Sequence, residues 1–157
     1  MKTFKDAAGH EWNIRLTLGL ARNVMDKLGI NLLHPEEQGT SGTTLLEALT
    51  DPFKVAEIVE ILLSREFEKR SVSSEDVIMG DWDGSTIEAA YQSLLGELVL
   101  FFESQGQRAR AKMIAKIDET TRLAMAKTSE RLDALDVPKM IDEALIDGAK
   151  FTKPLDD

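Results

Sequence analysis

The chain has 157 residues, of which 43% are hydrophobic and none is cysteine, and its formal net charge is −9. Its length suits one domain with an appendage, and the absence of cysteine excludes disulfides, thiolate metal ligands and a cysteine nucleophile, which fits a reducing cytoplasm. The acidic charge argues against nucleic-acid binding as the main activity, and the lack of an apolar signal core or an uncharged apolar run of roughly 18 residues predicts a soluble protein without a membrane anchor.

Residues 2–17 are predicted to form a β-hairpin. Trp12, Ile14 and Leu16 alternate with polar residues, a period of two that is typical of a strand with one buried face. Residues 6–9, which end in glycine, provide the turn. Because a lone hairpin is only marginally stable in water, we expect its apolar face to pack on helices.

A cap and a stop signal predict the first helix. Thr17 offers a hydroxyl at its start, and Gly29 fits the position just after its end at residue 28. Residues 34–43 are polar and glycine-containing, so they are predicted to form a loop.

Three further start signals follow this loop. A short helix is predicted over residues 44–49. Asp51-Pro52 then starts a helix that we expect to continue to Lys69, because proline is favoured in the first turn. Residues 73–76 resemble a capping box before another short helix.

The longest densely apolar run lies at residues 85–103. Its apolar residues recur three and four positions apart, and a helix that is apolar over most of its circumference cannot lie on a surface. We therefore expect it to be the central helix of the fold. The core expected around it comprises Trp12, Ile14, Phe53, Ile58, Leu62, Tyr91, Leu94, Leu98 and Phe101.

The predicted fold class is mainly α with a small N-terminal β-hairpin, in two parts. Residues 1–104 form the hairpin and a helical body, and residues 105–157 form an extended C-terminal helical arm and tail. The arm is rich in helix formers but thinly apolar, so we expect it to gain stability by packing on a partner. The predicted partner-binding stripe consists of Met113, Ile117, Ala124, Met125 and Leu132.

The sequence contains no motif that indicates a catalytic, cofactor or metal site. His10-Glu11 begins like a zinc-protease helix, but the second histidine would fall at Ile14, which belongs to a strand. Residues 81–84 resemble part of a calcium loop, but the first and last ligand positions of that register hold no carboxylate. We interpret His34, which lies in the predicted loop, as a surface histidine and not as a metal ligand. We therefore expect a protein that is not an enzyme and takes no cofactor, metal or small-molecule substrate.

Arg108, Arg110, Lys112 and Lys116 form a short basic patch, whereas residues 34–104 carry four basic and fifteen acidic side chains. The patch has no interleaved aromatic residues. A solvated face, or a docking site for an acidic protein surface, is therefore favoured over contact with nucleic acid.

The order of these features resembles a known group of proteins. The opening K-T-F-x-D-x-x-G-x-x-W-x-I is followed by L-G-I-N-L-L, by D-P-F, and by S-S-E-D before a central helix that ends in F-F. Over residues 1–103 this order is similar to that of small proteins encoded in phage and prophage tail gene clusters. Some members of the group are similar to tail assembly chaperones of long-tailed phages.

The resemblance implies a non-enzymatic role in the cytoplasm of a bacterial host cell. Tail chaperones hold the tape-measure protein, a very long helical chain, until tube subunits polymerise around it. Such a role requires weak, repeated binding of amphipathic helices, with tape-measure or tube proteins as partners. Two alternatives stay open: a structural accessory protein of the tail or virion, and a small regulator that acts by protein contact. Self-association into a homo-oligomer also stays open.

Overall fold

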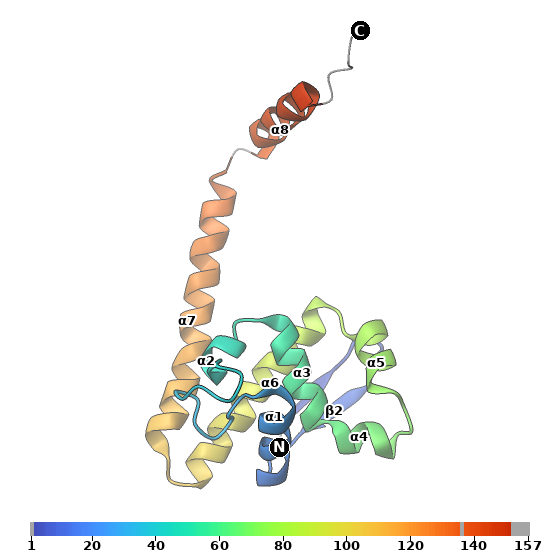
Figure 1. Ribbon diagram of the computed structural model, residues 1–157, viewed down its shortest axis with the longest axis vertical. Helices are drawn as coiled ribbons and strands as arrows, with labels where there is room; N and C mark the ends of the chain where they lie inside the picture. Colours follow the sequence, from blue (N-terminus) through green and yellow to red (C-terminus); the bar gives the residue numbers. More distant parts are fainter. Residues whose placement is uncertain (1, 136, 152–157) are drawn as a thin grey trace. The chain divides into compact units, whose positions relative to one another are not determined.

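The computed structural model describes residues 2–135 and 137–151, without the side chains of residues 121–122, 124–125, 137 and 146–151 (Figure 1). It divides into two compact units, Met1–Glu119 and Thr120–Asp157. The first unit, called the body below, contains the hydrophobic core. The fold is mainly α with a two-stranded N-terminal hairpin, as predicted.

The hairpin consists of β1 (Lys2–Lys5) and β2 (Glu11–Ile14). The strands pair antiparallel with Phe4 opposite Trp12. Gly9 at the end of the turn has a φ of 85°, a left-handed conformation that glycine adopts without strain. Trp12 is 1% exposed, so the alternation in the sequence correctly identified the buried face.

Helix α6 (Gly84–Ser104) is the central helix of the body, as its apolar run predicted. Asp83 caps it: a carboxylate oxygen accepts the backbone N–H of Thr86 at 2.9 Å. Leu94 and Leu98 are 1% and 0% exposed, because α6 packs against both strands and against α3 (Pro52–Leu62) (Figure 1).

The other helices of the body surround this centre. Helix α1 (Leu18–Leu28) has the predicted Thr17 cap and packs on α3. The remaining helices are α2 (Leu45–Ala48), α4 (Ser64–Lys69) and α5 (Ser74–Asp81). The predicted single helix from Pro52 to Lys69 is therefore interrupted. At Leu63, where φ is −95° and ψ is 4°, the chain leaves helical geometry, and Phe67 in α4 meets the Trp12 ring with 4.9 Å between ring centroids.

Two aromatic residues of the predicted core lie elsewhere. Phe53 is 81% exposed, so its assignment to the core was wrong. At about 100° per residue, Phe53 lies on the side of α3 opposite the buried Val55, Ile58 and Leu62. Phe101 is partly buried against the core rather than inside it. The other predicted core residues are buried.

The body extends beyond the predicted boundary at residue 104. Helix α7 (Arg108–Asp133) begins inside the body, where Ala111 and Ile114 are 4% and 0% exposed. Ala111, Ile114 and Ile117 lie three and four positions apart in the first three turns of α7, so these turns pack on the core although the helix as a whole is thinly apolar. Helix α8 (Val137–Phe151) belongs to the second unit.

Truncation of Leu98 should destabilise the protein strongly. We expect Leu98→Ala to lower the free energy of unfolding by about 2–5 kcal/mol, because it leaves a cavity at the centre of the body. Leu100→Ala is the matched control: it lies on the same helix but is 42% exposed. Urea unfolding followed by circular dichroism measures both, and similar losses for the two variants would contradict a central position of α6.

A pair of glycines allows the loop after α1 to approach its end. A Cβ at Gly39 would lie 1.9 Å from the backbone oxygen of Gly29. We expect Gly39→Ala to destabilise the protein by about 1–3 kcal/mol through this clash. A Cβ at Gly80 in α5 meets nothing within 4 Å, so Gly80→Ala should instead stabilise by up to about 1 kcal/mol. Thermal melting shows whether each variant is destabilised or stabilised. An unchanged melting temperature for Gly39→Ala would show that the loop does not pack against Gly29.

Candidate functional site

The predicted partner-binding stripe is divided between the two units: Met113 and Ile117 belong to the body, and the other three residues belong to the second unit. Met113 is half-buried, and Ile117 packs partly buried against the core, so this end of the stripe contributes to the fold of the body. Leu132 is 56% exposed. The side chains of Ala124 and Met125 lie outside the described residues.

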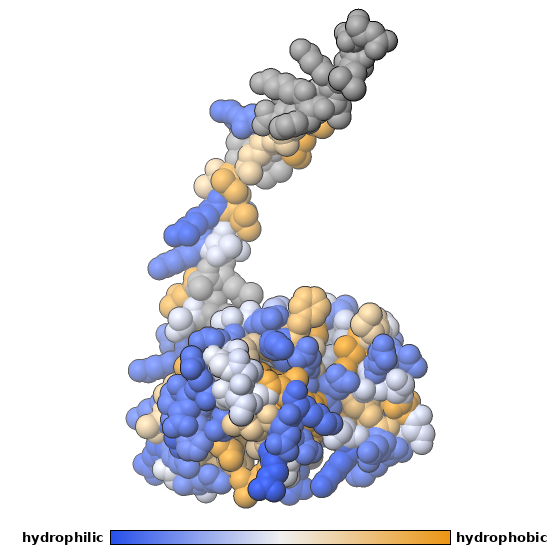
Figure 2. All heavy atoms as spheres, viewed as in Figure 1, coloured by the Kyte–Doolittle hydropathy of each residue, from blue (hydrophilic) through white to orange (hydrophobic). Residues whose placement is uncertain are grey.

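Exposed apolar residues are frequent in the second unit. Hydrophobic spheres lie at the surface of its helices (Figure 2). The large exposed side chains there are Leu123, Leu132, Leu135, Met140, Ile141 and Leu145. Three of them belong to α8, which was not included in the predicted site. The recurrence of apolar residues three and four positions apart over residues 137–145 was the available signal.

One member of the basic patch has a structural role in the body. The guanidinium of Arg110 lies 2.8 Å from Glu36 Oε1 and 2.8 Å from His34 Nδ1. The hydrogen bond from Arg110 lowers the pKa of Glu36, and the pKa of Arg110 is raised in return. A guanidinium can only donate, so Nδ1 of His34 is the acceptor in this contact.

The same contacts decide the chemistry of a possible cation site. The side chains of His34, Glu36 and Glu37 come close enough together to hold a metal ion. The Arg110 guanidinium already supplies the positive charge beside Glu36 and occupies the lone pair of His34 Nδ1. This cluster therefore ties the loop after α1 to α7.

A second cluster of titratable groups organises the hairpin turn. Asp6 Oδ1 accepts the backbone N–H groups of Ala8 and His10 at 3.0 and 2.9 Å, and Oδ2 accepts Trp12 Nε1 at 2.9 Å. Asp81 lies near enough to Asp6 and His10 for the three to hold a metal ion. Because both oxygens of Asp6 already accept N–H groups, its carboxylate stabilises the hairpin turn.

Removing the Asp6 carboxylate should destabilise the protein in a pH-dependent way. Burial acts to raise the pKa of Asp6, but the hydrogen bonds from Trp12, His10 and Ala8 and the charge of His10 outweigh it and hold the pKa below its ordinary value of 3.8. The carboxylate therefore stabilises the fold fully above pH 3.8 and loses this effect as the pH falls through its lower folded-state pKa.

We expect Asp6→Asn to lower the free energy of unfolding by about 1–3 kcal/mol at pH 7. The difference from the unmodified protein should shrink as the pH falls below the ordinary pKa of Asp6. Urea unfolding at pH 7 and at a pH below 3 measures it. A difference that stays constant with pH would contradict the ionised, hydrogen-bonded state of Asp6.

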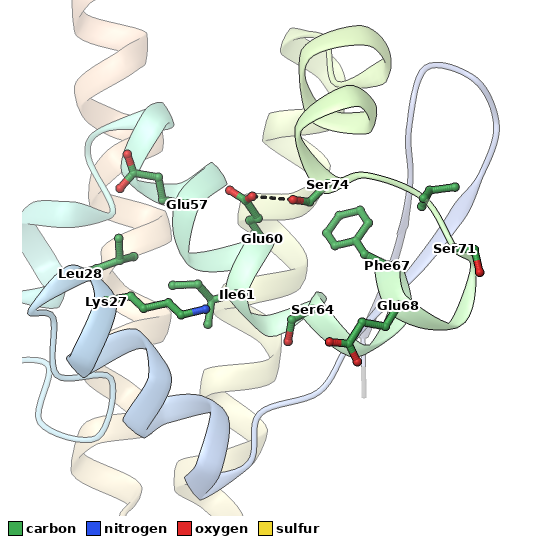
Figure 3. Close-up of a pocket in the computed structure, with 11 residues that line it drawn as sticks. Lys27, Leu28, Glu57, Glu60, Ile61, Ser64, Phe67, Glu68, Ser71 and Ser74 are labelled. Atoms are coloured by element: carbon green, nitrogen blue, oxygen red, sulfur yellow. Dashed lines mark hydrogen bonds between the residues drawn. The ribbon is translucent and has the colours of Figure 1, made fainter.

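The surface of the body also carries open hollows between helices. One, of about 490 Å³, lies beside α1, α3 and α4 (Figure 3), and another, of about 590 Å³, lies beside α1 and the segment that follows it. In the first, the Ser74 hydroxyl donates to Glu60 at 2.7 Å, and the lining contains no histidine to activate a serine.

Comparisons with protein-family models, with curated proteins and with solved structures gave no match to this chain. Among the helices within the described residues, none combines the length and the hydrophobicity that crossing a bilayer requires.

Proposed function

We propose that this protein is a non-enzymatic, tail assembly chaperone-like protein of a phage or prophage, and that its C-terminal helices bind an amphipathic helix of a tape-measure or other tail protein. The family is suggested by the resemblance of residues 1–103 to proteins of tail gene clusters. On this proposal the protein acts in the cytoplasm of a bacterial host cell, where tails assemble.

The observation that carries the proposal is the apolar face of α8. Met140, Ile141 and Leu145 are 51%, 54% and 66% exposed, and their spacing puts them on one face of the helix. Amphipathic helices gain most of their stability by burying such a face. Packing against the apolar face of a client helix would achieve this, a mode of recognition that recurs among helix-binding proteins.

The polar clusters of the body support a binding role over a catalytic one. Asp6 is engaged by the hairpin turn, and Arg110 joins His34 to Glu36. These groups have structural partners in the fold, whereas Met140, Ile141 and Leu145 of α8 are exposed. A role in holding another protein uses the exposed residues directly.

Changing the apolar face of α8 should abolish client binding without unfolding the body. We expect the triple variant M140Q/I141Q/L145Q to bind a coexpressed tape-measure protein of the same gene cluster at least about tenfold more weakly, since each buried apolar side chain contributes about 1.5–3 kcal/mol. Glutamine keeps the helix propensity high. The melting temperature should not change, because the core lies within the body. Size-exclusion chromatography and sedimentation of the purified complex measure the binding.

The matched control is L18Q/F53Q/M79Q, which makes three similar changes at residues that are 63%, 81% and 82% exposed on the body. It should bind like the unmodified protein. Equal weakening in both variants, or full binding by the α8 variant, would show that α8 is not the client site. A gene cluster without tape-measure or tube genes would contradict the proposed family.

A further inference from the structure

We infer that the hollow beside α1, α3 and α4 is a second client site, which takes a helical segment that carries lysine or arginine beside its apolar face. The inference deepens the proposed function and rests on it for the kind of client. It concerns the body alone and involves none of the residues of α8.

The floor of this hollow, called the groove from here on, is apolar and held in place by packing. Phe67 is 4% exposed and packs on Trp12, and Ile61 is 8% exposed. Val72, which is 41% exposed, also lines it. A client side chain that enters it would contact a preformed apolar surface, which lowers the entropic cost of binding.

The rim of the groove is acidic. Glu57, Glu60 and Glu68 line it together with a single cation, Lys27, and Figure 3 shows Lys27 and Glu68 extending from different elements of the wall. Glu57 is paired with Lys54 at 3.2 Å, and Glu60 accepts the Ser74 hydroxyl, which is neutral. The remaining negative potential favours a cationic segment and disfavours an acidic one.

The walls favour a helical client over an extended one. Both α3 and α4 bond their backbone groups internally. In the segment after α4, the N–H groups of Ser71 and Val72 donate to the carbonyl oxygens of Glu68 and Phe67 at 3.1 and 3.2 Å. These N–H groups are engaged, so strand addition cannot use them, which favours recognition by side chains, as in a helix-in-groove complex.

Fluorescence anisotropy with the full-length protein tests the inference. The probe is a labelled synthetic helical peptide with leucines on one face and lysines flanking them, and its partner probe replaces every lysine with glutamate. We expect the lysine peptide to bind and the glutamate peptide not to bind. Raising the salt concentration from 50 to 500 mM should weaken binding, because the attraction between rim and peptide is screened.

Two groove variants and two matched controls locate the site. E57Q/E60Q/E68Q should weaken binding of the lysine peptide about tenfold, whereas E47Q/E88Q/E103Q, with the same change in net charge at exposed residues that do not line the groove, should weaken it less than about twofold. Val72→Ser should also weaken binding, and Leu18→Ser, on another face of α1, should not. Melting curves establish that each variant is folded.

The outcomes separate this inference from the proposed function. Equal weakening by the two triple-glutamine variants, or unchanged binding in both groove variants, overturns the groove. Binding that is lost in M140Q/I141Q/L145Q and kept in the groove variants also overturns it, and supports the α8 site. Binding that is lost in the groove variants and kept in the α8 variant supports the groove even if α8 binds no client. Equal binding of both peptides overturns the assignment of a cationic client.

Discussion

The contact between α6 and the N-terminal hairpin is the interaction on which the fold of the body depends. Ser93 donates to the carbonyl oxygen of Thr3 at 3.0 Å, and the buried Glu97 accepts the backbone N–H of Leu16 at 3.0 Å. Gly96 lies between them in sequence, and a Cβ there would come within 3.0 Å of the Lys2 side chain. Small and hydrogen-bonding residues on this face of α6 therefore let a hairpin that would be marginal alone become part of the core.

Local signals in the sequence were sufficient for the elements of the body but not for every packing face. The caps at Thr17, Asp51 and Ser73 each accept the expected backbone N–H, because capping is decided within four residues. Phe53 was misassigned because hydrophobicity suggested burial while the phase of α3 pointed its ring outward. A first-turn aromatic next to a proline carries little information about which side of the helix meets the core.

Neither the extent of the body nor the groove could be predicted from the sequence, because both depend on tertiary contacts. The average composition of α7 concealed the fact that Ala111 and Ile114 complete the core, whereas its later turns belong to the second unit. The groove brings together Lys27, Glu60 and Phe67 from three helices. No spacing within a single segment could have indicated that combination. The chain thus combines a folded body, whose polar clusters stabilise its structure, with C-terminal helices in which several large apolar side chains are exposed.

We propose that the body folds without help from the C-terminal helices and that a client protein stabilises these helices. Hydrogen exchange of the full-length protein, measured by mass spectrometry with and without a tape-measure protein, tests it most directly. The account predicts that amides of α6 are protected close to the level of global unfolding, and that amides of α8 exchange at least about a hundredfold faster until the client is added. Equal protection of α6 and α8 in the protein alone, unchanged by the client, would contradict it.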